Sequence, residues 1–239
     1  MEVDETSKIA AAATAFATQL AREESALDQA ISTDRFATYL SGASGNRALA
    51  RALYIWDRDV SIAILADIAI LEVAMRNAMH AALSARWSAA WYENSDLELD
   101  DRSIGELRRA WDDLPSRVKR NRADPQLPGR LVARCMFGFW ANLLDAGTYV
   151  GFEPRRRKVD YEDLWRHALN DAFIGGAAEA RREGARYTRP WAHEAVQTVN
   201  ALRNRVAHHE PLINGFPLPG KADVYPQRTV TRPVENSPG

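Results

Sequence analysis

The segment from Asp59 or Ser61 to about Arg86 constrains the fold most, because it is the most hydrophobic stretch of the chain. Its apolar side chains recur every three or four residues, which predicts a helix with one buried face. No segment of the sequence shows the period-two alternation that is typical of a strand. We therefore expect an all-α fold in which other helices pack around this one. The residues expected on its buried face are Ile64, Ile68, Leu71, Met75 and Ala78.

A second helix is predicted near the C-terminal end. It begins near Pro190, which suits a first helical turn. It ends near the pair His208 and His209, because Pro211 disfavours a helical conformation at the residue before it. A histidine pair at such an end can be purely structural, since it can hydrogen-bond the free carbonyls at the negative end of the helix.

The same helix end carries residue types that suit phosphate chemistry. Asn204 and His208 are four residues apart and share one face, and Arg203 is adjacent to Asn204. Arginine can bind a phosphate through a forked pair of hydrogen bonds, and histidine can transfer a proton near neutral pH. These groups are sufficient for metal-free cleavage of RNA, in which the ribose 2′-OH attacks its own phosphate.

The sequence around this cluster resembles the R-x(4–6)-H signature of HEPN domains. The form present here is Arg203-Asn204-x-x-x-His208-His209-Glu210-Pro211, which is typical of the Abi-like (abortive infection) proteins of that superfamily. Residues 53–57 followed by residues 71–77 resemble the N-terminal half of that family, and residues 137–140 resemble its middle segment. The resemblance covers about residues 33–213.

The resemblance implies an HEPN-type helical bundle with extra helices and the activity of a metal-independent endoribonuclease in phage defence, or of a toxin. It implies that His208 transfers the proton, that Arg203 binds the phosphate and that Asn204 orients one of these groups. His209 and Glu210 are expected to support the site. RNA, a second copy of the chain and an antitoxin or defence protein are the expected partners, and neither a metal nor a cofactor is implied.

A polar strip on the hydrophobic helix has two interpretations. Glu72, Arg76 and His80 are spaced by four residues, with Asn77 beside them. The strip is either an exposed face with a Glu–Arg pair that contributes about 0.3–0.5 kcal/mol, or a supporting part of the site. The resemblance implies the second role for Glu72, Arg76 and Asn77, because this helix is then expected to pack against the helix that bears Arg203.

Helix geometry separates the two main residues of the motif. Arg203 and His208 are five residues apart, so at 100° per residue they diverge by about 140°. Either the last turn unwinds, or the two side chains reach the substrate from opposite flanks, or a two-fold dimer pairs Arg203 of one chain with His208 of the other. The sequence leaves these alternatives open.

Two basic segments are candidate phosphate contacts. The run Arg155, Arg156, Arg157 and Lys158 is predicted to be an exposed loop, because consecutive cations repel one another. It either contacts RNA or is only solvated. The same choice applies to the predicted loop at residues 115–129, whose basic residues are Arg117, Lys119, Arg120 and Arg122.

The composition sets the remaining expectations. The formal net charge of −1 means that any RNA binding must come from local basic patches. A single cysteine and an acidic start favour a reducing cytoplasm, and no apolar run is long enough to span a membrane. We expect an N-terminal helix within residues 1–32, the helical domain at 33–213 and a disordered tail rich in proline and glycine at 214–239. The alternative function is a non-catalytic HEPN-type module that binds RNA or protein.

Overall fold

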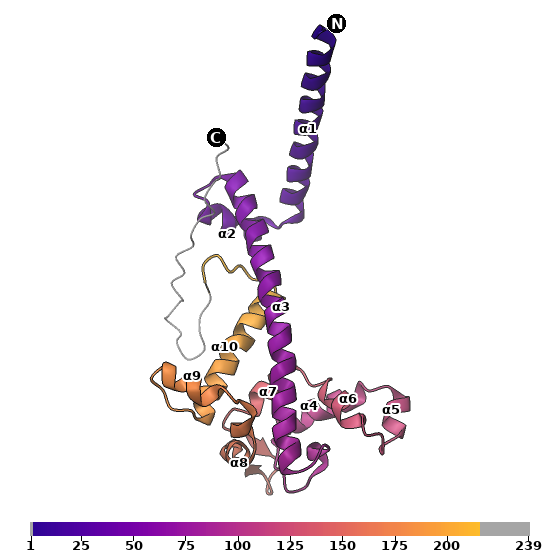
Figure 1. The fold of residues 1–239 in the computed structure, drawn as a ribbon, viewed down its shortest axis with the longest axis vertical. Helices are drawn as coiled ribbons and strands as arrows, with labels where there is room; N and C mark the ends of the chain where they lie inside the picture. Colours follow the sequence, from indigo (N-terminus) through magenta and orange to yellow (C-terminus); the bar gives the residue numbers. More distant parts are fainter. Residues whose placement is uncertain (1, 216–239) are drawn as a thin grey trace. The chain divides into compact units, whose positions relative to one another are not determined.

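A computed structural model of the chain describes residues 2–215, and the side chains of all of these except those at 2–6, 20–21, 24–25 and 27–28. Most of the predicted tail at 214–239 lies outside the described residues. Ten α-helices, two short 3₁₀ helices and one two-stranded sheet form the described part, which confirms an all-α fold (Figure 1). None of its helices combines the length and the apolar character needed to cross a bilayer.

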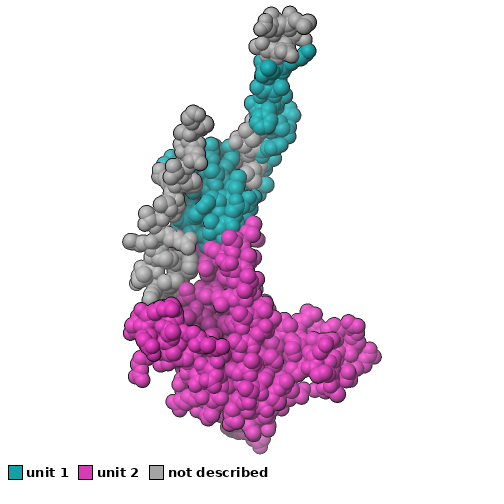
Figure 2. Space-filling model, viewed as in Figure 1, with its two compact units in different colours: residues 1–61, 211–214, 228–239 teal, residues 62–210, 215–227 magenta. Residues whose placement is uncertain are grey.

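The chain forms two compact units (Figure 2), and the boundary between residues 61 and 62 falls within one helix. Among described residues, the first contains 2–61 and 211–214, and the second contains 62–210 and 215. The predicted boundaries after residues 32 and 213 stay predictions.

The first unit is built around a buried carboxylate. It contains α1 (Glu2–Ala30), α2 (Thr33–Gly42) and the N-terminal part, up to Ser61, of α3 (Arg47–Arg86). Asp57 of α3 is buried, accepts a hydrogen bond from the Tyr39 hydroxyl at 2.9 Å, and accepts another from the backbone N–H of Leu212 at 2.9 Å. Residues 211–214 are thereby attached to α2 and α3. The core cluster of this unit consists of Ile31, Phe36, Tyr39, Ala43 and Ala50.

Helix α3 differs from its prediction in length and in part of its buried face. It runs without a break from Arg47, so the predicted start at Asp59 or Ser61 is wrong, and the sequence has neither glycine nor proline to interrupt it. Ile68 and Met75 are buried as expected, and Met79 and Leu83 continue that stripe. Ile64 and Ala78 are partly buried, whereas Leu71 is 45% exposed and its predicted burial is wrong.

The second unit surrounds the C-terminal part of α3, from Ile62 onward. In Figure 1, α9 and α10 lie on one side of it and α4, α5 and α6 on the other. Helix α7 packs against both α4 and α10, which places its aromatic residues at the centre. The bounds of the helices that follow α3 are η1 (Trp91–Glu93), α4 (Asp101–Asp112), α5 (Ser116–Arg120), α6 (Leu127–Val132), α7 (Phe137–Asn142), α8 (Tyr161–His167), η2 (Leu169–Ala172), α9 (Gly176–Arg182) and α10 (Arg189–Ala207).

An aromatic cluster forms the core of this unit. Trp91 is fully buried, stacks on Phe139 with ring centroids 6.4 Å apart, and meets Trp140 edge-on at 6.2 Å. Its indole N–H donates to Nδ1 of His80 at 2.9 Å, so its polar atom is satisfied inside the core. Aromatic pairs of this geometry contribute about 0.5–1.5 kcal/mol beyond the burial of their area.

A short hairpin interrupts the helices. Strands β1 (Tyr149–Val150) and β2 (Arg157–Lys158) pair antiparallel, with Tyr149 opposite Lys158 and Val150 opposite Arg157. Part of the predicted basic loop at 155–158 is therefore a strand. The predicted loop at 115–129 is also partly wrong, because it contains α5 and the start of α6.

Candidate functional site

Helix α10 carries the predicted catalytic motif, and its bounds match the prediction. Thr188 caps its first turn by accepting from the N–H of Trp191 at 3.4 Å, and Pro190 lies in that turn. The last helical residue is Ala207, and His208 is the C-cap. The prediction that the helix ends near the histidine pair is confirmed.

The chain leaves α10 through a Schellman motif, in which a histidine stands at the left-handed position. His209 has φ 55°, and its N–H donates to the carbonyl of Val206 at 3.0 Å. The N–H of Glu210 donates to the carbonyl of Arg205 at 2.9 Å. Glycine is the usual residue at this position, because a Cβ is disfavoured there. The side chains of Arg205 and Glu210 form an ion pair at 3.8 Å across the same turn.

The motif is open to solvent. Asn204, His208, His209 and Glu210 are exposed, and Arg203 is half-buried. Nη1 of Arg203 donates to Oδ1 of Asn204 at 3.3 Å, a long hydrogen bond between exposed groups. The cluster thus presents a guanidinium, an amide and two imidazoles on the surface at one helix end. Such groups can bind an anion and exchange protons without first breaking a buried network.

The polar strip on α3 is divided between core and surface. Glu72 and Arg76 are half-buried and Asn77 is exposed. Nε of Arg76 is buried and has no hydrogen-bond partner among the described residues. The charge of Arg76 acts on the Cys135 thiol, whose pKa is raised to about 12 by burial first and by Glu106 second, while Arg76 lowers it. Among described residues, no hydrogen bond joins this strip to the motif on α10.

His80, next on this strip, is a structural residue. Its Nδ1 accepts from Trp91, so the neutral ring carries its proton on Nε2. Burial lowers the pKa of His80, which keeps the ring neutral and able to accept.

The basic run lies on an exposed hairpin, and some of its members have partners. The guanidinium of Arg156 lies 4.2 Å from the ring centroid of Tyr149. Arg157 forms an ion pair with Glu98. Arg155 and Lys158 are also exposed. Contacts within the protein therefore hold Arg156 and Arg157, and Arg157 and Lys158 form strand β2.

A buried network that the sequence did not reveal lies near the first turn of α10. Asp100 is fully buried, caps α4 through the N–H of Ser103, and accepts from Arg102 at 2.7 Å and from the hydroxyl of Thr148 at 2.7 Å. Burial raises the pKa of Asp100, but hydrogen bonds from Ser103, Arg102 and Thr148 lower it further, so the net shift is downward. The network connects α4 to the hairpin.

His193 of α10 lies close to this network and was also not predicted. Burial lowers its pKa, whereas the charge of Asp145 raises it and the charges of Arg189 and Arg102 lower it. Arg189 donates to Glu162 at 3.0 Å and to the carbonyl of Leu144 at 2.9 Å. The sequence could have indicated this polar group by its spacing, since Arg189, His193 and Gln197 recur every four residues along one helix face.

Among residues 2–215, no group of three or more histidine, cysteine or acidic side chains has the geometry to hold a metal ion. Comparison of the chain with family models, with curated proteins and with solved structures found no match.

Proposed function

We propose that the chain is a metal-independent endoribonuclease of the Abi-like HEPN type, with its active site at the C-terminal end of α10. The observation that carries the proposal is the cluster at one helix end of Asn204, His208 and His209, which are exposed, with Arg203, which is half-buried. The left-handed backbone conformation of His209 supports it, since non-glycine residues held in disfavoured backbone conformations concentrate at functional sites.

The reaction assigned to this site needs no protein nucleophile. His208 accepts the proton of the ribose 2′-OH, the 2′ oxygen forms a bond to phosphorus, and the bond from phosphorus to the 5′ oxygen breaks. The 5′ oxygen takes up a proton from solvent water and leaves as a hydroxyl, and a 2′,3′-cyclic phosphate remains. Arg203 stabilises the charge that develops on the non-bridging oxygens, and Asn204 orients the phosphate. The backbone N–H groups of His209 and Glu210 close the turn that carries His208, and the exposed imidazole of His209 is proposed to support the site. Glu72, Arg76 and Asn77 are proposed to support the site from α3.

A homodimer is the proposed active form. The segment of α3 at residues 62–73 exposes large apolar side chains, which a monomer in water disfavours. Beside it, a groove of ≈350 Å³ is lined by apolar residues of α3 and α10, including Leu71 and Val199. Covering this surface with a second copy would bury both features. The exposed apolar residues of the segment are Ile62, Leu65, Ile70, Leu71 and Val73.

A mixture of two inactive variants can show whether each active site of the dimer contains residues from both chains. We propose to mix Arg203→Ala with His208→Ala after partial unfolding and joint refolding. If Arg203 of one chain acts with His208 of the other, each mixed dimer holds one intact site and cleavage returns. If both residues act within one chain, the mixture stays inactive, which would contradict a composite site.

The primary test is cleavage of a mixed RNA pool in EDTA. Wild type is expected to cut the RNA, while His208→Ala is expected to lose cutting and keep its helical content. His167→Ala is the matched control, because His167 is also exposed near a helix end and lies outside the motif. Equal cutting by a folded His208→Ala protein would refute the assignment. A role in phage defence or as a toxin in the cytoplasm, with an antitoxin or defence partner, belongs to the same proposal.

A non-catalytic RNA-binding module is the second candidate. The exposed basic hairpin at Arg155, Arg156, Arg157 and Lys158 favours it. It predicts salt-dependent RNA retention without cleavage, and substitution of these residues is expected to weaken retention by a similar factor for all RNA sequences.

A further inference from the structure

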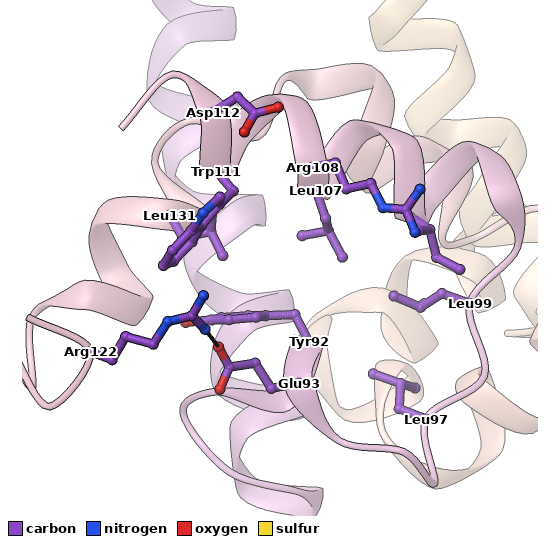
Figure 3. A pocket seen from close by; sticks show the side chains of 11 residues that line it. Tyr92, Glu93, Leu97, Leu99, Leu107, Arg108, Trp111, Asp112, Arg122 and Leu131 are labelled. Atoms are coloured by element: carbon purple, nitrogen blue, oxygen red, sulfur yellow. Dashed lines mark hydrogen bonds and ion pairs between the residues drawn. The ribbon is translucent and has the colours of Figure 1, made fainter. Parts of the chain in front are cut away.

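A pocket in the second unit lies outside the proposed active site. It has a volume of ≈530 Å³, within the range of about 300–1,000 Å³ that is usual for small-molecule sites. Its walls come from η1, residues 97–99, α4, Arg122 and α6. Figure 3 shows an apolar interior, to which Leu97, Leu99 and Leu107 contribute, with charged side chains at the edges.

The pocket combines aromatic surfaces with two arginines. The rings of Tyr92 and Trp111 line it, Arg122 extends toward them from one end, and Arg108 lies at the other end (Figure 3). The Arg122 guanidinium lies 4.6 Å from the ring centroid of Trp111. A planar, delocalised group therefore already occupies a stacking position on the indole.

Arg122 is held in place only weakly. Its guanidinium donates to Glu93 at 3.1 Å, and both side chains are mostly exposed. Exposed ion pairs contribute little to stability, so the guanidinium can turn to a phosphate at small cost. Burial, followed by the charge of Glu93, raises the pKa of Tyr92 to about 12, so its hydroxyl stays protonated and can donate at neutral pH.

The segment that forms much of the wall is strongly basic. Residues 108–134 contain eight arginines or lysines and three aspartates, which is a net charge of +5 in a chain whose total is −1. Arg117 and Arg120 of α5 are exposed beside Arg122 in the sequence. A local positive field of this kind attracts anions. The pocket therefore suits a ligand with a flat apolar part and a negative part.

We propose that this pocket binds a nucleotide, with the base stacked on Trp111 and the phosphate bound by Arg122. The indole face accepts any base, because every base has a π-face. Glu93 and Asp112 supply carboxylate acceptors for exocyclic amino groups of the base. The nucleotide is either part of an RNA strand or a free mononucleotide, and only the first source depends on the proposed ribonuclease function.

The test is a calorimetric titration of the full chain at physiological salt. The probes are AMP and a short single-stranded oligodeoxyadenylate, which lacks the 2′-OH and is not a substrate for the proposed cleavage. Trp111→Leu and Arg122→Gln are each expected to weaken binding about tenfold. Trp111→Phe keeps an aromatic face and is expected to stay within about threefold of wild type. Arg120→Gln removes the same charge outside the pocket and is expected to change affinity less than about twofold.

The outcomes separate this proposal from the ribonuclease. Binding of the oligomer much more tightly than AMP assigns the pocket to a strand, and equal binding assigns it to a free nucleotide. No saturable binding of either probe, or equal losses in Arg122→Gln and Arg120→Gln, would overturn the proposal. Because neither probe is cleaved, absence of ribonuclease activity does not affect these results. Circular dichroism of each variant confirms that it is folded.

Discussion

His209, which follows α10 in a left-handed backbone conformation, gives a prediction in which one substitution raises stability and lowers activity. His209 stands at φ 55°, where the Schellman motif normally has glycine. Its N–H bond to Val206 and the N–H bond of Glu210 to Arg205 use only backbone groups. Replacement by glycine therefore keeps both hydrogen bonds and removes the disfavoured Cβ. We expect His209→Gly to be more stable than wild type and less active on RNA.

The magnitude follows from two opposing terms. A non-glycine residue in the left-handed helical region costs about 1–2 kcal/mol. The greater freedom of glycine in the unfolded chain offsets about 0.4–1 kcal/mol of that gain. The net increase in the free energy of unfolding is about 1 kcal/mol, and for a chain of 239 residues this raises Tm by about 2–4 °C. His209→Ala keeps the Cβ and should show no such increase.

Urea unfolding followed by circular dichroism measures this difference. The expected order of stability is His209→Gly above wild type, with His209→Ala at or below wild type. If glycine and alanine have the same stability, the Cβ is not strained and the backbone account of this turn is wrong. If His209→Gly cleaves RNA as fast as wild type, the supporting role of His209 is wrong while the backbone account stands.

Two further predictions concern the cores. Asp57→Ala leaves two buried donors without an acceptor and is expected to lower the free energy of unfolding by about 2–4 kcal/mol. Asp59 is exposed, so Asp59→Ala should change this free energy by less than about 0.5 kcal/mol. Equal effects of the two substitutions in urea unfolding would contradict the role of Asp57 as a buried acceptor. Burial lowers the pKa of His80 in the folded state below its unfolded-state pKa of 6.5. The stability that neutral His80 contributes is therefore complete above pH 6.5 and is lost as pH falls through the lower, folded-state pKa. As pH falls below about 7, the free energy of unfolding of His80→Gln should therefore decrease less steeply than that of wild type. An unchanged pH dependence would assign the decrease to other groups such as His193.

Local signals were sufficient to predict the ends of α10 and the all-helical class. Pro190 and Pro211 restrict the backbone directly, so the sequence around them indicates where the helix begins and ends. The same local logic failed at α3, where Asp59 or Ser61 was predicted to start a helix that in fact begins at Arg47. Asp57 is a mid-helix residue whose partner Leu212 is 155 positions away, and no local pattern encodes that contact.

Features made by distant segments were also not predictable. The pocket brings together Tyr92, Trp111 and Arg122 from three separate segments, so no spacing rule identifies it. The left-handed turn gave no signal because His209 stands where glycine would have indicated it. The motif itself was visible because its residues lie within one short segment, 203–211, and its catalytic role stays a prediction.

The most direct measurement uses two RNA oligonucleotides of one sequence, the second with a single 2′-deoxyribose at the position where wild type cuts the first. In EDTA, we expect wild type to cut the first into a fragment ending in a 2′,3′-cyclic phosphate and a fragment beginning with a 5′-hydroxyl, as identified by mass spectrometry. The second strand is expected to stay intact at that position, and His208→Ala should cut neither. Cleavage of the deoxy position, or equal cleavage by His208→Ala, would contradict the proposed ribonuclease.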